Sequence, residues 1–262
     1  MLCGLVVALS LFAGRPGQAA MLSAALARAE PTPTPVMRLL SPRELARRLA
    51  TPTPTPRPVM PDELRGKILF LSPVLDRRGV FVLDPVTGAI GQLTDPWPHA
   101  CAERRDYFSA TRQYEAVVVK VQGQLQVRYY DHAFGIARPL TRFGFFDDGR
   151  QTFGHAWDPA WSPVDDVVAL VATEDGDEEI FLVRKDEWPP RQLTDEPTGW
   201  AWDVQPSWSP DGRQIVFMSN RNGHRQLWLM NADGSDPHPL TDPALEARDP
   251  VWVKYTGADG CP

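Results

Sequence analysis

A short pattern that returns four times along the chain limits its fold more than any other feature of the sequence. Each copy closes on a leucine and a threonine, and these threonines, spaced 47, 53 and 47 residues apart, are Thr94, Thr141, Thr194 and Thr241. Two copies open on Pro-x-Trp-Ser-Pro, at Pro206–Pro210 and Pro159–Pro163, and Asp106–Ala110 is a looser version. A period of about 40 to 50 residues indicates stacked sheets, because one small unit cannot cover both of its faces alone.

The best-defined copy, Gln205–Asp242, predicts four antiparallel strands. Its two apolar runs, Gln214–Met218 and Gln226–Met230, flank Asn222-Gly223, a dipeptide typical of tight hairpin turns. Ser209-Pro210-Asp211-Gly212 predicts a type I turn before the first run, because proline suits the second position of such a turn and glycine the fourth. Each copy is therefore expected to be one four-stranded meander.

The first copy lacks an opening strand, and the end of the chain can supply one. Proline-rich sequence precedes Gly66, whereas Pro250–Val253 begins a fifth unit that stops after one strand. Pairing of that strand with Ile68–Leu71 would remove two exposed sheet edges. The sequence therefore predicts an all-β fold: a small β-propeller of about four four-stranded blades, closed by pairing of the C-terminal strand with blade 1 and preceded by a Pro/Thr-rich N-terminal region.

The repeat resembles that of TolB-type, WD-like β-propellers over about residues 66–253. The resemblance rests on Trp-Ser-Pro-Asp-Gly at 208–212, Ser-Asn-Arg-Asn-Gly at 219–223, Leu-Trp-Leu-Met-Asn-Ala-Asp-Gly-Ser at 227–235 and Leu-Thr-Asp at 240–242. The third copy has Val164-Asp165-Asp166 in place of Asp-Gly, and the second lacks the tryptophan. The resemblance implies a propeller fold. TolB itself has more blades and an extra domain, so the likeness does not carry TolB's partners to this chain.

The first twenty residues predict a targeting segment. Leu2–Ala13 is an apolar run followed by small residues, which is typical of a signal peptide and short for a membrane span. No basic residue precedes the run, and a start at Met21 or Met37 is the alternative. We expect an extracytoplasmic protein, secreted or held in the cell envelope, with a membrane tether if residues 1–20 are retained.

Proline–threonine repeats indicate that residues 21–62 are a semi-rigid linker. Ser41–Leu49 within this linker predicts a short helix that begins with a capping box. The remaining residues, 63–262, contain all of the repeats and are expected to form the propeller domain.

The charge of the chain argues against a nucleic-acid partner. Residues 1–62 hold seven arginines and three acids out of 27 basic and 33 acidic residues, which leaves 20 basic and 30 acidic residues for the propeller domain. An acidic domain is repelled by a phosphate backbone. We therefore expect no nucleic-acid binding, and a protein or a cell-envelope polymer remains as the partner class.

The sequence contains no motif that assembles a familiar catalytic or metal site. Gly-x-Ser-x-Gly, His-Glu-x-x-His, paired Cys-x-x-Cys and phosphate-loop motifs do not occur. The acid-rich stretches Asp175–Glu179 and Asp233–Asp236 carry the oxygen ligands that calcium prefers, but tight turns require the same residue types. We predict no cofactor, no metal site and no catalytic residues.

Two cysteines, Cys101 and Cys261, lie outside the predicted leader. Export would allow them to form a disulfide. The C-terminal tail would then have to double back, because its strand is expected to end on the opposite face from Cys101. This topology favours free thiols, and the sequence leaves both states open.

A candidate binding face is predicted where two kinds of loop emerge together. In each meander, the loop that leads into the first strand and the loop that joins strands two and three lie at the same end of the sheet, and these loops are rich in aromatic and basic residues. The candidate residues are Trp97, His99, Phe145, Phe146, His155, Trp157, Trp200, Trp202, Arg221 and His224. For the three tryptophans at 157, 200 and 202, a lid over the blade junction is an equal alternative.

The tryptophans of the opening signature, Trp161, Trp208 and Trp252, are expected to pack between blades instead. The predicted function is a non-catalytic binding scaffold for protein–protein or envelope-polymer interaction. The alternative is a glycan-active or other hydrolase or lyase that uses polar groups at the ring centre. Two carboxylates, or a histidine with an arginine, converging in a central pocket would favour the enzyme.

Overall fold

The computed structural model describes residues 58–142, 154–174, 177–187, 189–195 and 201–262. Contacts divide the chain after Thr55, and all described residues belong to the unit Pro56–Pro262. The predicted signal peptide, the linker helix and three candidate binding residues, Phe145, Phe146 and Trp200, lie outside the described residues.

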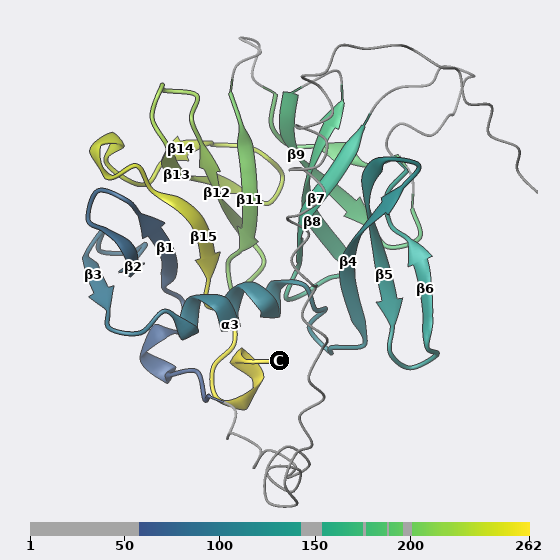
Figure 1. Cartoon of the computed structure of the whole chain (residues 1–262), viewed down its shortest axis with the longest axis horizontal. Helices are drawn as coiled ribbons and strands as arrows, with labels where there is room; N and C mark the ends of the chain where they lie inside the picture. The colour runs from purple at the N-terminus through teal and green to yellow at the C-terminus, as the bar shows by residue number, and fades with distance from the viewer. Residues whose placement is uncertain (1–57, 143–153, 175–176, 188, 196–200) are drawn as a thin grey trace, which may run out of the picture. The chain divides into compact units, whose positions relative to one another are not determined.

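Within the described residues the strands form four antiparallel sheets, here called blades 1 to 4 in the order of the repeats (Figure 1). Blade 1 contains β15 (Arg248–Trp252), β1 (Ile68–Ser72), β2 (Asp76–Leu83) and β3 (Ile90–Leu93). Blade 2 contains β4 (Tyr114–Val121), β5 (Gln124–Asp131) and β6 (Ile136–Pro139). Blade 3 contains β7 (His155–Trp161), β8 (Val167–Glu174), β9 (Asp177–Arg184) and β10 (Arg191–Gln192). Blade 4 contains β11 (Asp203–Trp208), β12 (Gln214–Ser219), β13 (Gln226–Asn231) and β14 (His238–Pro239).

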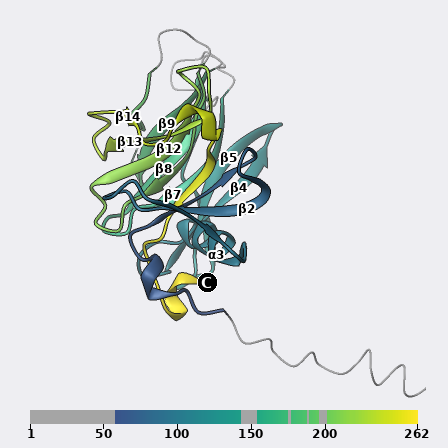
Figure 2. The ribbon, with the colours of Figure 1, turned by 90° about the vertical axis from the view of Figure 1, so that its left-hand side faces the viewer.

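The described helical segments lie between or beside the blades. They are the 3₁₀ turns η1 (Asp62–Leu64), η2 (Pro243–Leu245) and η3 (Ala258–Gly260), and the α-helix α3 (Trp97–Asp106). The C-terminal turn η3 lies close to η1 and α3 in both ribbon views (Figure 1, Figure 2), and Met60 pairs with Gly257 through two backbone hydrogen bonds. The two ends of the described domain therefore meet at α3.

The Ser-Pro-Asp-Gly turn forms as the sequence predicts. The N–H of Gly212 donates to the carbonyl of Ser209 (2.9 Å), and Gly212 has a φ of +69°, which is strained for residues with a Cβ. The Ser209 hydroxyl accepts the N–H of Gln214 (2.9 Å) and donates to Asp211 (2.7 Å). These bonds reverse the chain between the first two strands of blade 4.

The repeated threonine has a structural role at the outer end of the blade. In blades 2, 3 and 4 its hydroxyl oxygen accepts a backbone N–H from β5, β9 and β13, respectively, at 2.9 to 3.0 Å: Val127 donates to Thr141, Ile180 to Thr194 and Leu227 to Thr241. Thr94 of blade 1 is exposed, and its hydroxyl lies 3.4 Å from the Asp95 carboxylate. In blades 2, 3 and 4 the closing signature therefore reflects strand pairing.

Each repeat tryptophan is buried between two blades, as predicted. The exposed fractions of Trp161, Trp208 and Trp252 are 1%, 3% and 5%. Trp208 packs between Ala160 of blade 3 and Phe217 of blade 4, and its Nε1 donates to the carbonyl of Ala160 (3.0 Å). Trp161 packs between blades 2 and 3, and Trp252 packs between blades 4 and 1.

The C-terminal strand pairs with blade 1, but closure of a ring by that strand is not confirmed. Ile68 lies opposite Trp252 and Leu69 opposite Val251, so β15 is the first strand of blade 1 as predicted. No described sheet closes on itself, and the blades form separate sheets.

Helix α3 occupies the place where blades 1 and 2 would otherwise meet. The core cluster on this side of blade 1 contains Ala102 of α3, Leu64 of η1 and Met60, together with apolar residues of blade 1 and its C-terminal extension. This cluster contains no residue from blade 2. Blade 2 also lacks a fourth strand among the described residues, because its first-strand position holds one bridge, between Phe108 and Glu115. The prediction of four-stranded blades is therefore wrong for blade 2.

In the part of the chain that the structure describes, no helix has the length and apolar character needed to span a bilayer.

Candidate functional site

The segment that contains Trp97 and His99, which was predicted to be a loop, is the helix α3. Pro98 suits the first turn, where a missing N–H costs nothing, and Arg104 and Arg105 in the last turn face the negative end of the helix dipole. Its apolar residues follow no helical stripe, which is why periodicity did not reveal it. The helix packs against β7 and β15 (Figure 1), and this contact creates a central cavity.

The cavity has a volume of about 70 Å³ and lies between α3 and the first strands of blades 1, 3 and 4. Each of these strands contributes the residue before the proline of its Pro-x-Trp signature: Asp249, Asp158 and Gln205. All three have left-handed backbones, with φ of 51°, 47° and 59°, and the strand register shifts at or beside each of them. The repeat therefore places three equivalent bulges around one point.

Acidic groups gather at this cavity. Burial, and then the carboxylates of Asp249 and Glu103, raise the pKa of Asp158 to about 6. His99 donates from Nε2 to the carbonyl of Asp249 (2.7 Å), and its Nδ1 lies 3.9 Å from a Glu103 oxygen. Gln205 and Asp249 are joined by two hydrogen bonds, one between their side chains and one from the Asp249 N–H to Oε1 of Gln205 (2.9 Å). The site is thus acidic, with one histidine among four carboxylates, of which Asp106 is paired with Lys254.

A buried ion pair fixes α3 behind the cavity. Asp106 accepts a hydrogen bond from Lys254 and another from the Ser207 hydroxyl (2.6 Å). Burial raises the pKa of Asp106 and lowers that of Lys254, and the attraction between the two charges opposes both shifts. Arg105 donates to three backbone carbonyls at 2.9 to 3.0 Å and lies 3.8 Å from the ring centre of Tyr255. The helix is therefore held largely by polar contacts.

Cys101 of α3 and Cys261 form a disulfide. The expectation of free thiols was wrong because it treated the region around Cys101 as a loop on the far side of blade 1. Instead α3 carries Cys101 toward the tail, and the tail turns back at Gly257, whose φ is +64°. Arg112 Nη2 also donates to the carbonyl of Asp259 (2.8 Å), which holds the tail beside the start of blade 2.

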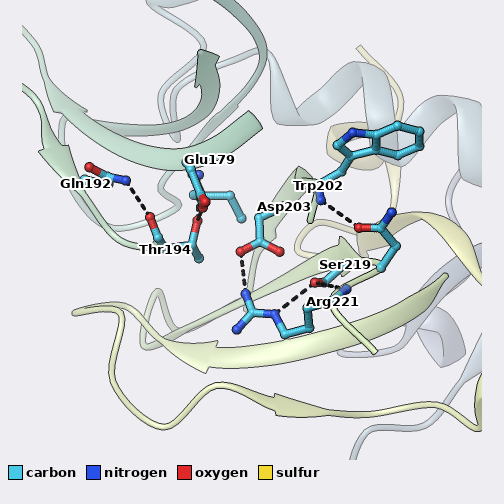
Figure 3. A network of polar contacts seen from close by, with 9 residues as sticks. Glu179, Gln192, Thr194, Trp202, Asp203, Ser219 and Arg221 are labelled. Carbon is cyan, nitrogen blue, oxygen red and sulfur yellow. Dashed lines mark hydrogen bonds and ion pairs between the residues drawn. The ribbon is translucent and has the colours of Figure 1, made fainter. Parts of the chain in front are cut away.

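Trp202, from the predicted binding face, is exposed, and its backbone is hydrogen-bonded to the neighbouring loop of blade 4. It is 44% exposed, and its backbone N–H donates to the side-chain oxygen of Asn220 (2.7 Å; Figure 3). Arg221 beside it is ion-paired with buried Asp203 and lies 4.6 Å from the ring centre of Trp228. Burial raises the pKa of Asp203, and Arg221 opposes this. The loop that leads into β11 and the loop between β12 and β13 are therefore neighbours. Arg221 stabilises this end of blade 4.

A second part of the same network lies on blade 3 (Figure 3). Thr194 donates a hydrogen bond to the buried Glu179 carboxylate, and Gln192 donates to the carbonyl of Thr194 (2.8 Å). Glu178 forms a parallel bridge with Trp202. The lead-in loop of blade 4 is thus connected to blade 3.

The other described candidates are spread over α3, β7 and the loop between β12 and β13. Trp97 begins α3 and is half-buried, and His99 lines the central cavity. His155 accepts the N–H of Leu125 through Nδ1 (3.1 Å), and Trp157 is half-buried within β7. His224 is exposed and pairs with Glu246 (2.8 Å).

Sequence reasoning missed the central carboxylates. Asp158 and Asp249 follow no catalytic motif, and the signal that could have found them is their shared place before the repeat proline. Among the described residues, no three His, Cys, Asp or Glu side chains are grouped as metal ligands. Asp233 accepts hydrogen bonds from the N–H and hydroxyl of Ser235 (3.0 and 2.6 Å), which is turn chemistry.

A comparison with known protein families agrees with the propeller fold described above. Residues 150–255 match a family model described as the TolB beta propeller domain. The chain carries TolB-like β-propeller repeats. A search among curated proteins finds no match.

Solved structures similar to this TolB-like chain include TolB from Acinetobacter baumannii, at 19% identity and a TM-score of 0.45 over 71% of this chain and 43% of the other. A putative TolB from Agrobacterium tumefaciens has 22% identity and a TM-score of 0.42 over 72% and 63%. An oligogalacturonate lyase in complex with manganese has 14% identity and a TM-score of 0.40 over 67% and 52%. The TolB-like chain thus spans less than two thirds of the length of each.

Proposed function

We propose that this protein is an extracytoplasmic, non-catalytic binding scaffold whose partner, a protein or a cell-envelope polymer, contacts the blade 4 loops around Trp202. The TolB-like propeller fold supports protein binding in general. The observation that carries the finer proposal is the exposed indole of Trp202, held in place through its backbone by Asn220 and next to the Arg221–Asp203 pair. An exposed aromatic side chain on a fixed backbone loses little entropy on binding, which is typical of interface hot spots.

The disulfide supports an extracytoplasmic location. Disulfides persist in oxidising compartments and are rare in a reducing cytosol. Cys101 and Cys261 are paired, and residues 1–20 carry the apolar run expected of an export signal. N-terminal sequencing of the protein from its native host should begin near Ala20, or the intact segment should fractionate with the membrane. Full-length protein in the soluble cytoplasmic fraction contradicts the location.

The binding proposal is tested by Trp202→Ala. A partner is first identified by crosslinking to the purified wild-type protein in an envelope extract and then titrated as a purified component. We expect Trp202→Ala to weaken binding about 30-fold, or about 2 kcal/mol, because an anchoring indole is lost.

The matched control is Phe134→Ala, which removes an aromatic ring that is 75% exposed on the β5–β6 loop, at the opposite end of its blade. This variant should bind like the wild type, and both variants should keep the wild-type melting temperature. Equal affinities for all three proteins contradict the assignment of the binding face.

A second candidate function is catalysis in the central cavity. It is favoured by the convergence of Asp158, Asp249 and Glu103 with His99 around one space, together with a pKa of about 6 for Asp158. A carboxyl group that is half protonated near pH 6 can act as a general acid beside an ionised carboxylate. Under this function, turnover of an envelope glycan should be lost in Asp158→Asn and kept in Trp202→Ala. Wild-type turnover by Asp158→Asn contradicts it.

A further inference from the structure

Among the described residues, the inner edge of blade 2, along β4, is mostly unpaired. Its sheet has the order β4-β5-β6, whereas the other three blades carry a further strand inside the one equivalent to β4. The only described pairing on the inner side of β4 is near its start, where Ala116 donates its N–H to Tyr107 (2.7 Å) and Tyr114 accepts from Ser109 (2.9 Å). Backbone groups alternate in direction along a strand, so the N–H groups of Val118 and Lys120 also face this inner edge.

The exposure of the β4 side chains also indicates that a neighbouring strand is missing. Val118 is 43% exposed, Lys120 is exposed, and Val117 and Val119 are only half-buried. The equivalent strand of blade 4, β12, is buried from Ile215 to Ser219. Exposed, unpaired strand edges are templates for pairing with another chain.

The charge beside this edge indicates what kind of segment would fit. Tyr107, which bonds to Ala116, also lines the central cavity together with Asp158 and Glu103. A segment paired with β4 beyond Ala116 therefore ends beside acidic groups whose cavity lining contains His99 but no lysine or arginine. Basic side chains on such a segment would be attracted to them.

We propose that the inner edge of β4 binds an extended, basic segment of a partner protein as the missing first strand of blade 2. This inference rests on the proposed protein-binding function but uses a different surface from Trp202. Backbone hydrogen bonds to Val118 and Lys120 hold the segment, and its lysine or arginine side chains face the carboxylates of the central cavity.

The probe is a fluorescein-labelled synthetic peptide of alternating valine and lysine, compared with a version in which glutamate replaces every lysine. In Val118→Pro the inner edge loses an N–H. The matched control, Ala137→Pro, removes an N–H from the outer edge of the same blade, since Arg138 and not Ala137 bonds to β5 in this register. Both variants are first compared with the wild type by melting temperature.

We expect Val118→Pro to weaken the lysine peptide at least tenfold, Ala137→Pro to leave its affinity unchanged, and the glutamate peptide to bind at least tenfold more weakly. In the wild type, which avoids any folding defect of the variants, the peptide should slow hydrogen exchange at Val118 and Lys120. Trp202→Ala should bind the peptide normally, so failure of the blade 4 loop proposal is separable from failure of this one.

Three results overturn the proposal. The first is exchange at Val118 that the peptide does not change. The second is equal binding of the basic and acidic peptides. The third is protection of Val118 that rises with protein concentration in the absence of peptide, together with dimer formation, because the edge then pairs with a second copy of the chain.

Discussion

The junction between blades 3 and 4 and the junction between blades 1 and 2 are held together by different kinds of contact. Between blades 3 and 4, Trp208 fills an apolar seam in which Ala160, Ile180 and Phe217 are buried. Between blades 1 and 2, α3 contributes Ala102 to an apolar cluster and is otherwise fixed by the Asp106–Lys254 pair and the Cys101–Cys261 disulfide. Apolar seams gain stability from every packed atom, whereas a polar junction depends on a few partners that must all be present.

Removing residues 249–262 should destabilise the fold more than any other change considered for the two junctions. The truncation deletes most of β15, leaves Asp106 without Lys254 and removes Cys261. The combined loss exceeds about 5 kcal/mol, which is comparable to the whole stability of many domains. We expect no cooperative thermal transition by circular dichroism. An unchanged melting temperature would show that the tail does not complete blade 1.

Lys254→Ala should destabilise the fold by about 4 kcal/mol, because it leaves Asp106 charged and unpaired in a buried position. The matched double variant, Asp106→Leu with Lys254→Met, removes both charges and should recover most of that loss. Urea denaturation of the three proteins measures both effects. A single variant as stable as the wild type would mean that α3 is not held by this pair.

Trp208→Ala should cost about 3 kcal/mol, because it opens a cavity in the seam between blades 3 and 4. Urea denaturation of the variant and the wild type measures this loss. A variant as stable as the wild type would mean that Trp208 does not fill the seam.

Cys261→Ser should cost about 2 kcal/mol, since the disulfide restricts the unfolded chain over a separation of 160 residues. Reductant should lower the melting temperature of the wild type toward that of the variant and leave the variant itself unchanged. If reductant has no effect on the wild type, the bond does not stabilise the α3 junction.

Asp158→Asn should change the stability of the fold the least. It should raise the stability, whereas the other variants lower it. The pKa of Asp158 is about 6 in the folded protein against an ordinary 3.8, so the folded state holds this proton more tightly and loses stability as the pH rises from about 4 to 6. The variant should therefore be more stable than the wild type by about 1 to 2 kcal/mol at pH 8 and equally stable at pH 4. Thermal unfolding across this pH range checks the prediction, and a gain at pH 4 would contradict it.

The blade 4 repeat was predictable residue by residue. Its Ser-Pro-Asp-Gly turn, its hairpin at Asn222-Gly223 and the burial of Trp208 all follow from local turn chemistry and short-range alternation. The pairing of β15 with β1 was also predictable, because an unmatched strand at one end of a repeat array fits a missing strand at the other.

The sequence alone determined the repeat, its turns, its inward tryptophans and the C-terminal strand of blade 1, because these depend on neighbouring residues and on a period that recurs along the chain. Only the tertiary structure decided the α3 junction, the Cys101–Cys261 bond and the carboxylates around the central cavity. Those features join segments separated by up to 160 residues, and no local pattern at Cys101, Asp158 or Lys254 specifies the partner that burial brings to each.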